Sequence, residues 1–410
     1  MRLYLFLVFI FLSPVSKAQQ TLTLSGKLID AETEEPIIFA SIGIDGKSVG
    51  TVSNTLGEFD FHVPYVYKDY DMVIRMLGFN NISAKISDLA FQDTLILRLN
   101  KSSKVLEEVV IQDSLSGADI VSAAILYIDK NYANEPFMMN GFYRDLKKVG
   151  GKYFSLLEAA VKIYDEDYTE PKNKNRLRER VALMEVRKSL GYSNRFTRYF
   201  DEYNLLEDLL LHNNVRYRQF PEEEIFYSSF RRGKTTVYNG KRVHVTSCNF
   251  AVPENQGAML IKLYVDAESY AIVRMEYKRT YNQEILRKKG DLVSKYISEV
   301  KTIDFNEYLG KMYLNLITLE SQVNWYDEET NELKFETELQ QELLINNIEV
   351  NPDDRIGRTE KMRRYGLQYQ DQRYNREFWN NYNVIKDTPL DNEIVADLEE
   401  LGTLEEQFEY

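Results

Sequence analysis

Five oxygen-bearing side chains lie close together in the stretch GTVSNTLGEFDF, residues 50–61. They are Ser53, Asn54, Thr55, Glu58 and Asp60. A calcium loop would need several carboxylates that converge from spaced positions. Here alternation after Gly57 places Glu58, Asp60 and His62 on the solvent face of one expected strand, and Ser53 and Asn54 are neutral. Because glycine permits the positive φ of a tight connection, the stretch predicts a turn between two strands.

The serine hydrolase pattern G-x-S-x-G is matched by residues 46–50, with Ser48 in the place of the nucleophile. That motif works only as a strained turn from a strand into a helix. Here it lies between two expected strands with no helix after it. We therefore expect no catalytic role for Ser48.

Zinc peptidase chemistry and cysteine catalysis both lack the spacing they need. His62, His212 and His244 lie in different segments, and none is followed by the paired His and Glu of a zinc peptidase. Cys248 is the one cysteine, so a disulfide framework is excluded and a packed strand thiol is predicted. His244 is four positions from Cys248, which on one strand is about 13 Å, too far for direct pairing.

Two acidic groups could supply calcium ligands or the acid and base of a glycosidase. They are Asp165-Glu166-Asp167 and the pair Asp69 and Asp71. Glycoside hydrolysis needs two carboxylates about 5–10 Å apart across a cleft. Each run is local and ends an expected strand, where solvated turn acids are ordinary. We expect no catalytic, cofactor-binding or metal-binding residues in this chain.

Basic residues concentrate at 172–198 and, mixed with tyrosines and Trp379, at 355–379. Such a mixture can stack nucleic-acid bases, but the formal net charge of −13 argues against nucleic acid as a partner. A solvated face or pairing with the acidic excess is predicted. If either cluster is functional, an anionic surface such as a phosphorylated glycolipid fits better.

The first 18 residues have the pattern of a secretory signal peptide. Arg2 precedes the apolar run 3–12, Pro14 breaks it, and Ser16-Lys17-Ala18 ends on small residues. The run is shorter than the roughly 20 residues of a membrane span, and no later segment predicts a transmembrane helix. Cleavage after Ala18 would remove Arg2 and Lys17, which takes the charge from −13 to −15. The remaining chain suggests two or three domains at roughly 150 residues each.

Two β-rich regions follow. Residues 19–100 predict a β-sandwich of short strands at 21–29, 37–44, 58–63, 72–76 and 94–99. After a linker at 101–115, residues 116–350 predict a helix over 116–134, a hairpin around Gly150-Gly151 and a short helix over 201–212. Long strands from 225 onward predict an antiparallel meander, including a hairpin at Asn239-Gly240.

Residues 351–410 form a tail with an aromatic and basic segment and an acidic helix. The fold class is mainly β (α+β), a transthyretin-like sandwich followed by a large curved antiparallel sheet with a few helices.

The N-terminal region resembles the carboxypeptidase regulatory-like domain. The residues that carry this resemblance are Gly26, Asp30, Glu35-Pro36, Ala40, Gly50-Thr51, Gly57, Phe59 and Met76-Leu77-Gly78-Phe79. The family is a transthyretin-like β-sandwich, common as an N-terminal module of envelope proteins in Gram-negative bacteria. Ser53-Asn54 departs from the Thr-Asp that such domains often carry. The resemblance implies an accessory module without the catalytic residues of carboxypeptidases.

Two further segments resemble parts of envelope proteins. Residues 106–111 look like the segment after this module in TonB-dependent receptors, but the 299 residues that follow (410 − 111) are too few for their barrel of about 22 strands. A linker strand is predicted, and docking on TonB stays open. Residues 262–276 resemble a hairpin of lipoprotein-carrier-like half-barrels, in which a curved sheet wraps acyl chains.

These features together predict an exported, non-enzymatic binding or scaffold protein in the periplasm or at the outer membrane. Its expected partner is an envelope protein or another outer-membrane component. One alternative is a lipid or lipoprotein carrier, with a lipid or glycolipid ligand on the large sheet. A second, disfavoured alternative is a hydrolase with scattered carboxylates. Packed apolar faces on the large sheet would favour the scaffold. An open apolar groove would favour the carrier, and convergent carboxylates in a cleft would favour the hydrolase.

Overall fold

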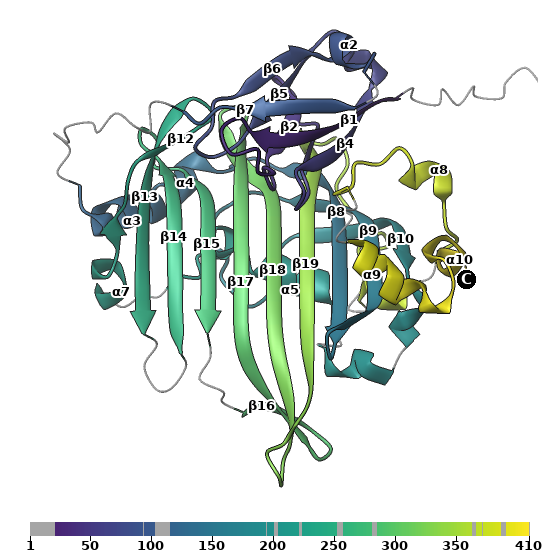
Figure 1. The fold of residues 1–410 in the computed structure, drawn as a ribbon. Coiled ribbons are helices and arrows are strands. Elements are labelled where there is room, and N and C mark those ends of the chain that lie inside the picture. The colour runs from purple at the N-terminus through teal and green to yellow at the C-terminus, as the bar shows by residue number, and fades with distance from the viewer. Residues whose placement is uncertain are drawn as a thin grey trace, which may run out of the picture.

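The computed structural model describes residues 21–92, 94–102, 115–193, 195–200, 204–220, 224–251, 257–280, 285–362, 366–370, 372–386 and 391–409. The predicted signal peptide at 1–18 and the TonB-receptor-like segment at 106–111 lie outside these residues. Within them, no helix is long and apolar enough to span a membrane. Figure 1 shows a small β-module above the ends of a long, curved sheet.

The N-terminal module is the predicted sandwich of two small sheets. One has the order β4 (Glu58–Pro64), β1 (Thr21–Asp30), β7 (Leu95–Leu99), and the other β3 (Gly50–Val52), β2 (Ser41–Ile44), β5 (Asp71–Arg75), β6 (Ile82–Lys85). Alternate residues of β4, Phe59, Phe61 and Val63, are fully buried against Ile42 and Ile74 of the other sheet. A short helix, α2 (Ile86–Leu89), adds Ile86 to this core.

The rest of the chain builds one twelve-stranded sheet, in which every neighbouring pair is antiparallel. Its order is β10 (Arg180–Lys188), β9 (Lys152–Asp165), β8 (Phe137–Val149), β19 (Leu333–Val350), β18 (Lys311–Asp327), β17 (Leu292–Tyr308), β15 (Ile272–Thr280), β14 (Ala258–Asp266), β13 (Lys241–Ala251), β11 (Arg231–Arg232). Two short strands lie off this path: β12 (Thr236–Tyr238) pairs with β13, and β16 (Ile285–Lys289) pairs with β17. The predicted meander is present, and its last strand pairs back onto β8.

Turn chemistry places the hairpins where the sequence predicts them. Asn239 and Gly240 have φ values of 49° and 72°, as a type I′ turn requires, and they join β12 to β13. Gly150 and Gly151 also have positive φ and join β8 to β9. A side chain other than Gly or Asn would be strained at such positions.

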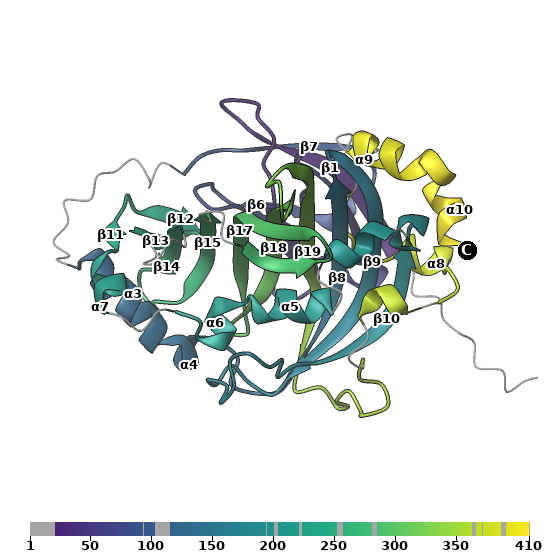
Figure 2. The same ribbon diagram turned by 90° about the horizontal axis from the view of Figure 1, so that it is seen from below.

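Helices cover one face of the large sheet, and the C-terminal tail covers part of the other (Figure 2). The first group is α3 (Gly117–Leu126), α4 (Ile128–Asn131), α5 (Leu205–Leu211), α6 (Asn214–Tyr217) and α7 (Glu224–Ser228). The second is α8 (Arg376–Trp379), α9 (Asp391–Leu398) and α10 (Leu404–Phe408). The predicted helix over 116–134 is present as α3 and α4, with Ser116 as its N-cap in a capping box.

Consecutive residues of β8 show that the sheet is packed on both faces. Tyr143 is fully buried in the core under the helices. Phe142 points the other way and is fully buried against Trp379 of α8, with ring centroids 6.4 Å apart. Both faces of the sheet therefore carry apolar side chains that need a cover.

The tail also fastens the N-terminal module. The backbone N–H of His62 donates to Asn383 Oδ1 at 2.7 Å, and Asn383 Nδ2 donates to the His62 carbonyl at 3.1 Å. Lys386 Nζ donates to Asp60 Oδ1 at 3.0 Å. The expectation that Asp60 and His62 face solvent is therefore wrong. A strand face that would be solvated in an isolated sandwich here meets a segment more than 300 residues away.

We expect Asn383→Ala to weaken this attachment, because the substitution leaves two half-buried backbone groups of His62 without their partner. The free energy of unfolding should fall by about 1–3 kcal/mol, measured by urea denaturation. Asn80→Ala, at an exposed position of the same module, is the matched control and should change stability little. Equal stability of both variants and the wild type would contradict a fastening role for the tail.

Candidate functional site

The stretch that opens the sequence analysis is a turn, as predicted. Ser53 Oγ donates to the Ile37 carbonyl at 2.7 Å, and Asn54 Oδ1 accepts from the N–H groups of Leu56 and Glu58 at 3.0 and 2.8 Å. Asn54 Nδ2 donates to the Lys386 carbonyl at 3.0 Å, so the turn also meets the tail. These polar side chains therefore satisfy backbone groups.

Ser48 lies in the connection between β2 and β3, where the module meets the large sheet. Its hydroxyl is 2.6 Å from Asn347 Oδ1 and 2.7 Å from the Ile348 carbonyl, both on β19. No helix follows this turn. Ser48 therefore joins the module to the large sheet by a hydrogen bond, and it does not occupy the strand-to-helix turn that a serine nucleophile needs.

The three histidines lie in separate elements, and Cys248 shares strand β13 with His244. His62 Nδ1 is 2.9 Å from Thr23 Oγ1 in the module, His244 is buried on β13, and His212 follows α5. Cys248 is buried, and burial raises the pKa of its thiol to about 11. Within the described ranges, no group of three or more His, Cys, Asp or Glu side chains is arranged to hold a metal ion.

The acidic groups have different environments. Asp69 is exposed, and Asp71 forms an ion pair with Lys85 at 3.0 Å, so both are surface acids. Asp165 differs from the expectation of a solvated turn acid, because only 2% of its surface is exposed. Arg216 Nε of α6 donates to Asp165 Oδ2 at 2.6 Å. A buried arginine 51 residues away thus explains the burial of this carboxylate.

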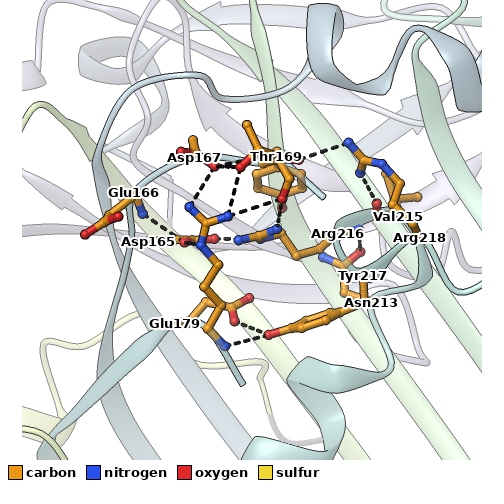
Figure 3. Close-up of polar contacts among 12 residues, drawn as sticks. Asp165, Glu166, Asp167, Thr169, Glu179, Asn213, Val215, Arg216, Tyr217 and Arg218 are labelled. Atoms are coloured by element: carbon orange, nitrogen blue, oxygen red, sulfur yellow. Dashed lines mark hydrogen bonds and ion pairs between the residues drawn. The ribbon is translucent and has the colours of Figure 1, made fainter. Parts of the chain in front are cut away.

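Figure 3 shows that Asp165 belongs to a larger polar network. Arg178 contacts Asp167 at 2.9 Å, and Arg216 Nη1 donates to the Thr169 carbonyl at 2.9 Å. The Tyr217 hydroxyl donates its proton to Glu179, and the Tyr217 hydroxyl oxygen accepts from the backbone N–H of Arg178 at 3.1 Å. Burial and the nearby charge of Asp165 raise the pKa of Glu179 to about 7, and burial also raises the pKa of Asp165.

This network brings two carboxyl groups together but encloses them. Asp165, Glu179, Arg216 and Tyr217 are each at most 4% exposed. A substrate cannot reach them without movement of α6 or the 166–179 segment. We therefore interpret the network as a structural connection that holds α6 against β9.

The basic clusters are used largely for internal pairing. Arg187 of β10 contacts Glu158 of β9 at 2.5 Å, and Lys174 contacts Glu170 at 2.9 Å. In the second cluster, Arg376 contacts Glu405 at 2.6 Å. Arg363, Arg364 and Tyr365 lie outside the described residues. Pairing with the acidic excess, as predicted, accounts for these contacts.

The best candidate site is a cavity of about 380 Å³ between the large sheet and the segment around α5. Figure 2 shows α5 lying across the face formed by β17, β18 and β19. The sheet wall consists of Tyr296, Glu299, Leu319, Ser321, Val323, Thr337, Leu339 and Gln341. The facing wall includes Tyr199 and Phe200, which lie at and just after the end of η5 (Arg195–Tyr199), and Leu205, Asp208, Leu211 and His212. Gln219 and Arg287 also line the cavity. Half-buried side chains such as Tyr296 and Arg287 keep part of this lining accessible to solvent.

Strand register and one amide contact set the shape of the cavity. Glu299 of β17 lies opposite Ser321 of β18, so both project from the same face. Gln341 of β19 donates to the Leu205 carbonyl at the start of α5 at 2.9 Å. Its amide also donates to Tyr143 Oη at 2.9 Å. The helix is thus held against the sheet at one end of the cavity.

A buried lysine controls the electrostatics beside this cavity. Lys301 is 3% exposed, and its Nζ donates to Asn214 Oδ1 at 2.6 Å and lies 3.4 Å from His212 Nδ1. Burial lowers the pKa of Lys301 to about 8. Burial and the charge of Lys301 lower the pKa of His212 to about 3, so His212 is neutral at physiological pH. Burial raises the pKa of Glu299.

The sequence analysis missed this site, although one signal was present. Glu299 and Lys301 share the face of β17 that carries Ile303 and Phe305, both fully buried. Charged residues on the apolar face of an expected strand indicate an internal polar site. The depth of the cavity could not be predicted, because it depends on the distance between α5 and the sheet.

The enclosed network predicts a pH dependence of stability. The pKa of Glu179 is about 7 in the folded protein, compared with 4.5 for an unperturbed glutamate. Between these values the folded state retains a proton that the unfolded state releases, so the free energy of unfolding falls as pH rises from about 4.5 to 7. Glu179→Gln should reduce this fall by on the order of 1–3 kcal/mol, measured by urea denaturation at several pH values.

Glu349→Gln, at an exposed position of β19, is the control and should leave the pH profile unchanged. If the profile of Glu179→Gln also matched that of the wild type, Glu179 would not carry a proton at neutral pH in the folded protein.

Comparison with known proteins gives one family match and some low structural similarities. Among solved structures, a lipovitellin described under lipid–protein interactions is similar to this chain, with 10% identity and a TM-score of 0.24. The match covers 54% of this chain and 26% of the lipovitellin chain. A DUF1329 family protein from Desulfovibrio piger ATCC 29098 matches 58% of this chain and 93% of its own at 8% identity, with a TM-score of 0.21. No curated protein matches the chain. Residues 24–111 match the model of the CarboxypepD_reg-like domain, and the chain therefore contains that domain at its N-terminal end.

Proposed function

We propose that this protein is an exported, non-enzymatic binding protein of the bacterial envelope, and that its large sheet holds a small ligand in the cavity beside α5. The observation that supports this proposal is the cavity of about 380 Å³, lined by both apolar and polar side chains. Small-molecule sites in proteins are typically concave, with a few polar groups placed among apolar ones. The volume suits a small molecule, at the lower end of the usual range of about 300–1,000 Å³.

In this proposal the CarboxypepD_reg-like module serves as the attachment to a partner. The module is fastened to the sheet through Ser48 and to the tail through Asn54 and His62. It also exposes large apolar side chains, with Val66 67% exposed and Phe91 91% exposed. The proposed partner is an envelope protein or another outer-membrane component.

Lipid carriage, the first alternative, has weaker support from the geometry. An acyl chain needs a continuous apolar groove, whereas this cavity has Asp208, His212 and Glu299 in its walls. The hydrolase alternative would need two carboxylates at a set distance across an accessible cleft. The pair Asp165 and Glu179 is enclosed, so this alternative rests on Asp208 and Glu299, which both line the cavity. The mixed polar and apolar lining supports a small-ligand site.

Filling the cavity provides a direct test. Ser321→Trp should block the cavity, because Ser321 lies in its wall, whereas Ser298→Trp adds the same side chain on the neighbouring strand outside that wall. We expect native mass spectrometry of the wild type, purified from its own envelope, to show an additional small mass that is lost on denaturation. The mass should persist in Ser298→Trp and be absent in Ser321→Trp.

A wild type that gives only the polypeptide mass under gentle conditions would contradict tight ligand binding. A lipid-sized mass that disappears on organic extraction would instead support the carrier. Circular dichroism of both tryptophan variants controls for loss of folding.

Export has its own test. The protein recovered from the periplasm or the outer membrane should begin at Gln19, because the segment before it has the pattern of a signal peptide. Leu7→Arg interrupts the apolar run and should leave unprocessed protein in the cytoplasm, whereas Leu7→Ile should be processed normally. The intact mass of each fraction distinguishes these forms, and an unprocessed wild type confined to the cytoplasm would contradict export.

A further inference from the structure

One carboxylate in the cavity wall has cationic neighbours but no direct contact with them. Glu299 is 9% exposed, and its side chain makes no hydrogen bond or ion pair with the residues that the structure describes. An ionised carboxylate is an acceptor with two oxygens. The cavity therefore presents an acceptor that a ligand could satisfy.

The opposite wall presents a donor. Lys301 Nζ lies 3.4 Å from His212 Nδ1, and a protonated amine can only donate. His212 therefore accepts at Nδ1 and carries its proton on Nε2, and its ring lines the cavity. Asn214 Oδ1 holds Lys301 in this position at 2.6 Å. The two walls thus offer an acceptor and a donor to one ligand.

The charges around the cavity decide which ligand class fits. The positive charges of Lys301 and Arg279 act on Glu299, which disfavours a cationic ligand at that carboxylate. Asp208 and Glu299 both line the cavity, which disfavours an anionic one. A hydroxyl group can donate to Glu299 and accept from His212, whereas an ammonium group can only donate. Tyr199 and Phe200 provide aromatic surface for the C–H face of a ring.

We infer that the cavity binds a neutral, polyhydroxylated ligand of the sugar class, with Glu299 accepting from a ligand hydroxyl and His212 donating to one. This inference rests on the proposed binding function and names the ligand chemistry of the same cavity. Asp208, Gln341 and Ser321 lie in the same walls and complete the set of polar groups that hydroxyls can meet.

Isothermal titration calorimetry with defined probes tests the inference. The probes are N-acetylglucosamine and cellobiose as neutral saccharides, putrescine as a diamine, and octanoate as an acyl chain. We expect at least one saccharide to bind the wild type and to bind Glu299→Gln about tenfold more weakly, because a neutral hydrogen bond replaces a charged one. Glu320→Gln removes a charge from an exposed position next to Ser321 and should bind as the wild type does.

Each outcome separates the two proposals. Saccharide binding that is weakened in Glu299→Gln and lost in Ser321→Trp supports the inference. Binding of only putrescine or octanoate, lost in Ser321→Trp, overturns the ligand class but leaves the binding function intact. Saccharide binding of equal strength in Glu299→Gln and the wild type overturns the role of Glu299. If no probe binds and the envelope-purified protein carries no ligand, both proposals fail.

Discussion

The architecture depends on one constraint, which is that both faces of the large sheet around β8 must be removed from water. Adjacent residues of β8, Phe142 and Tyr143, are fully buried on opposite faces. An antiparallel sheet can leave one face solvated only when that face is polar. Here the chain provides two covers, the helices α3 to α7 on one face and the module with the C-terminal tail on the other (Figure 2). The tail is thus part of the core.

Buried charges mark the points where the covers attach. Under the tail, Glu158 accepts from Arg144 at 2.8 Å and contacts Arg187, whose guanidinium lies 4.5 Å from the centre of the Trp379 ring. Under α6, Asp165 and Arg216 play the same part. Desolvation offsets much of the attraction in such pairs, so we expect their main contribution to be the selection of one docking arrangement over others. The cavity lies at the margin of the helical cover, where packing gives way to polar side chains.

Local patterns in the sequence predicted much of the fold. The alternation at 58–63, the Asn239-Gly240 turn and the Ser116 cap each act over a few residues, and the structure confirms all three. The regulatory-like domain was recognisable because its glycine and aromatic positions are spaced along a single short segment, and the family match at 24–111 confirms it.

Features that depend on distant partners were not predictable in this way. Asp165 is buried because of Arg216, and Asp60 is covered because of Lys386. The cavity combines Glu299 on β17 with His212 after α5, and nothing in the spacing of these two residues indicates that they share a site. The side-chain period along β17 could show only that charges lie on the buried face.

The pairing of β8 with β19 has a consequence for how the chain folds. Phe137 lies opposite Val350, 213 positions later (350 − 137), so the centre of the sheet cannot close until β19 is available. Contacts of such long sequence separation slow folding, since the cost of closing the loop precedes the gain from pairing. Until then β8 has an unpaired edge, and it carries apolar side chains on both faces. The backbone groups of such an edge can pair with other chains. A nascent chain that has not yet delivered β19 is therefore exposed to such pairing.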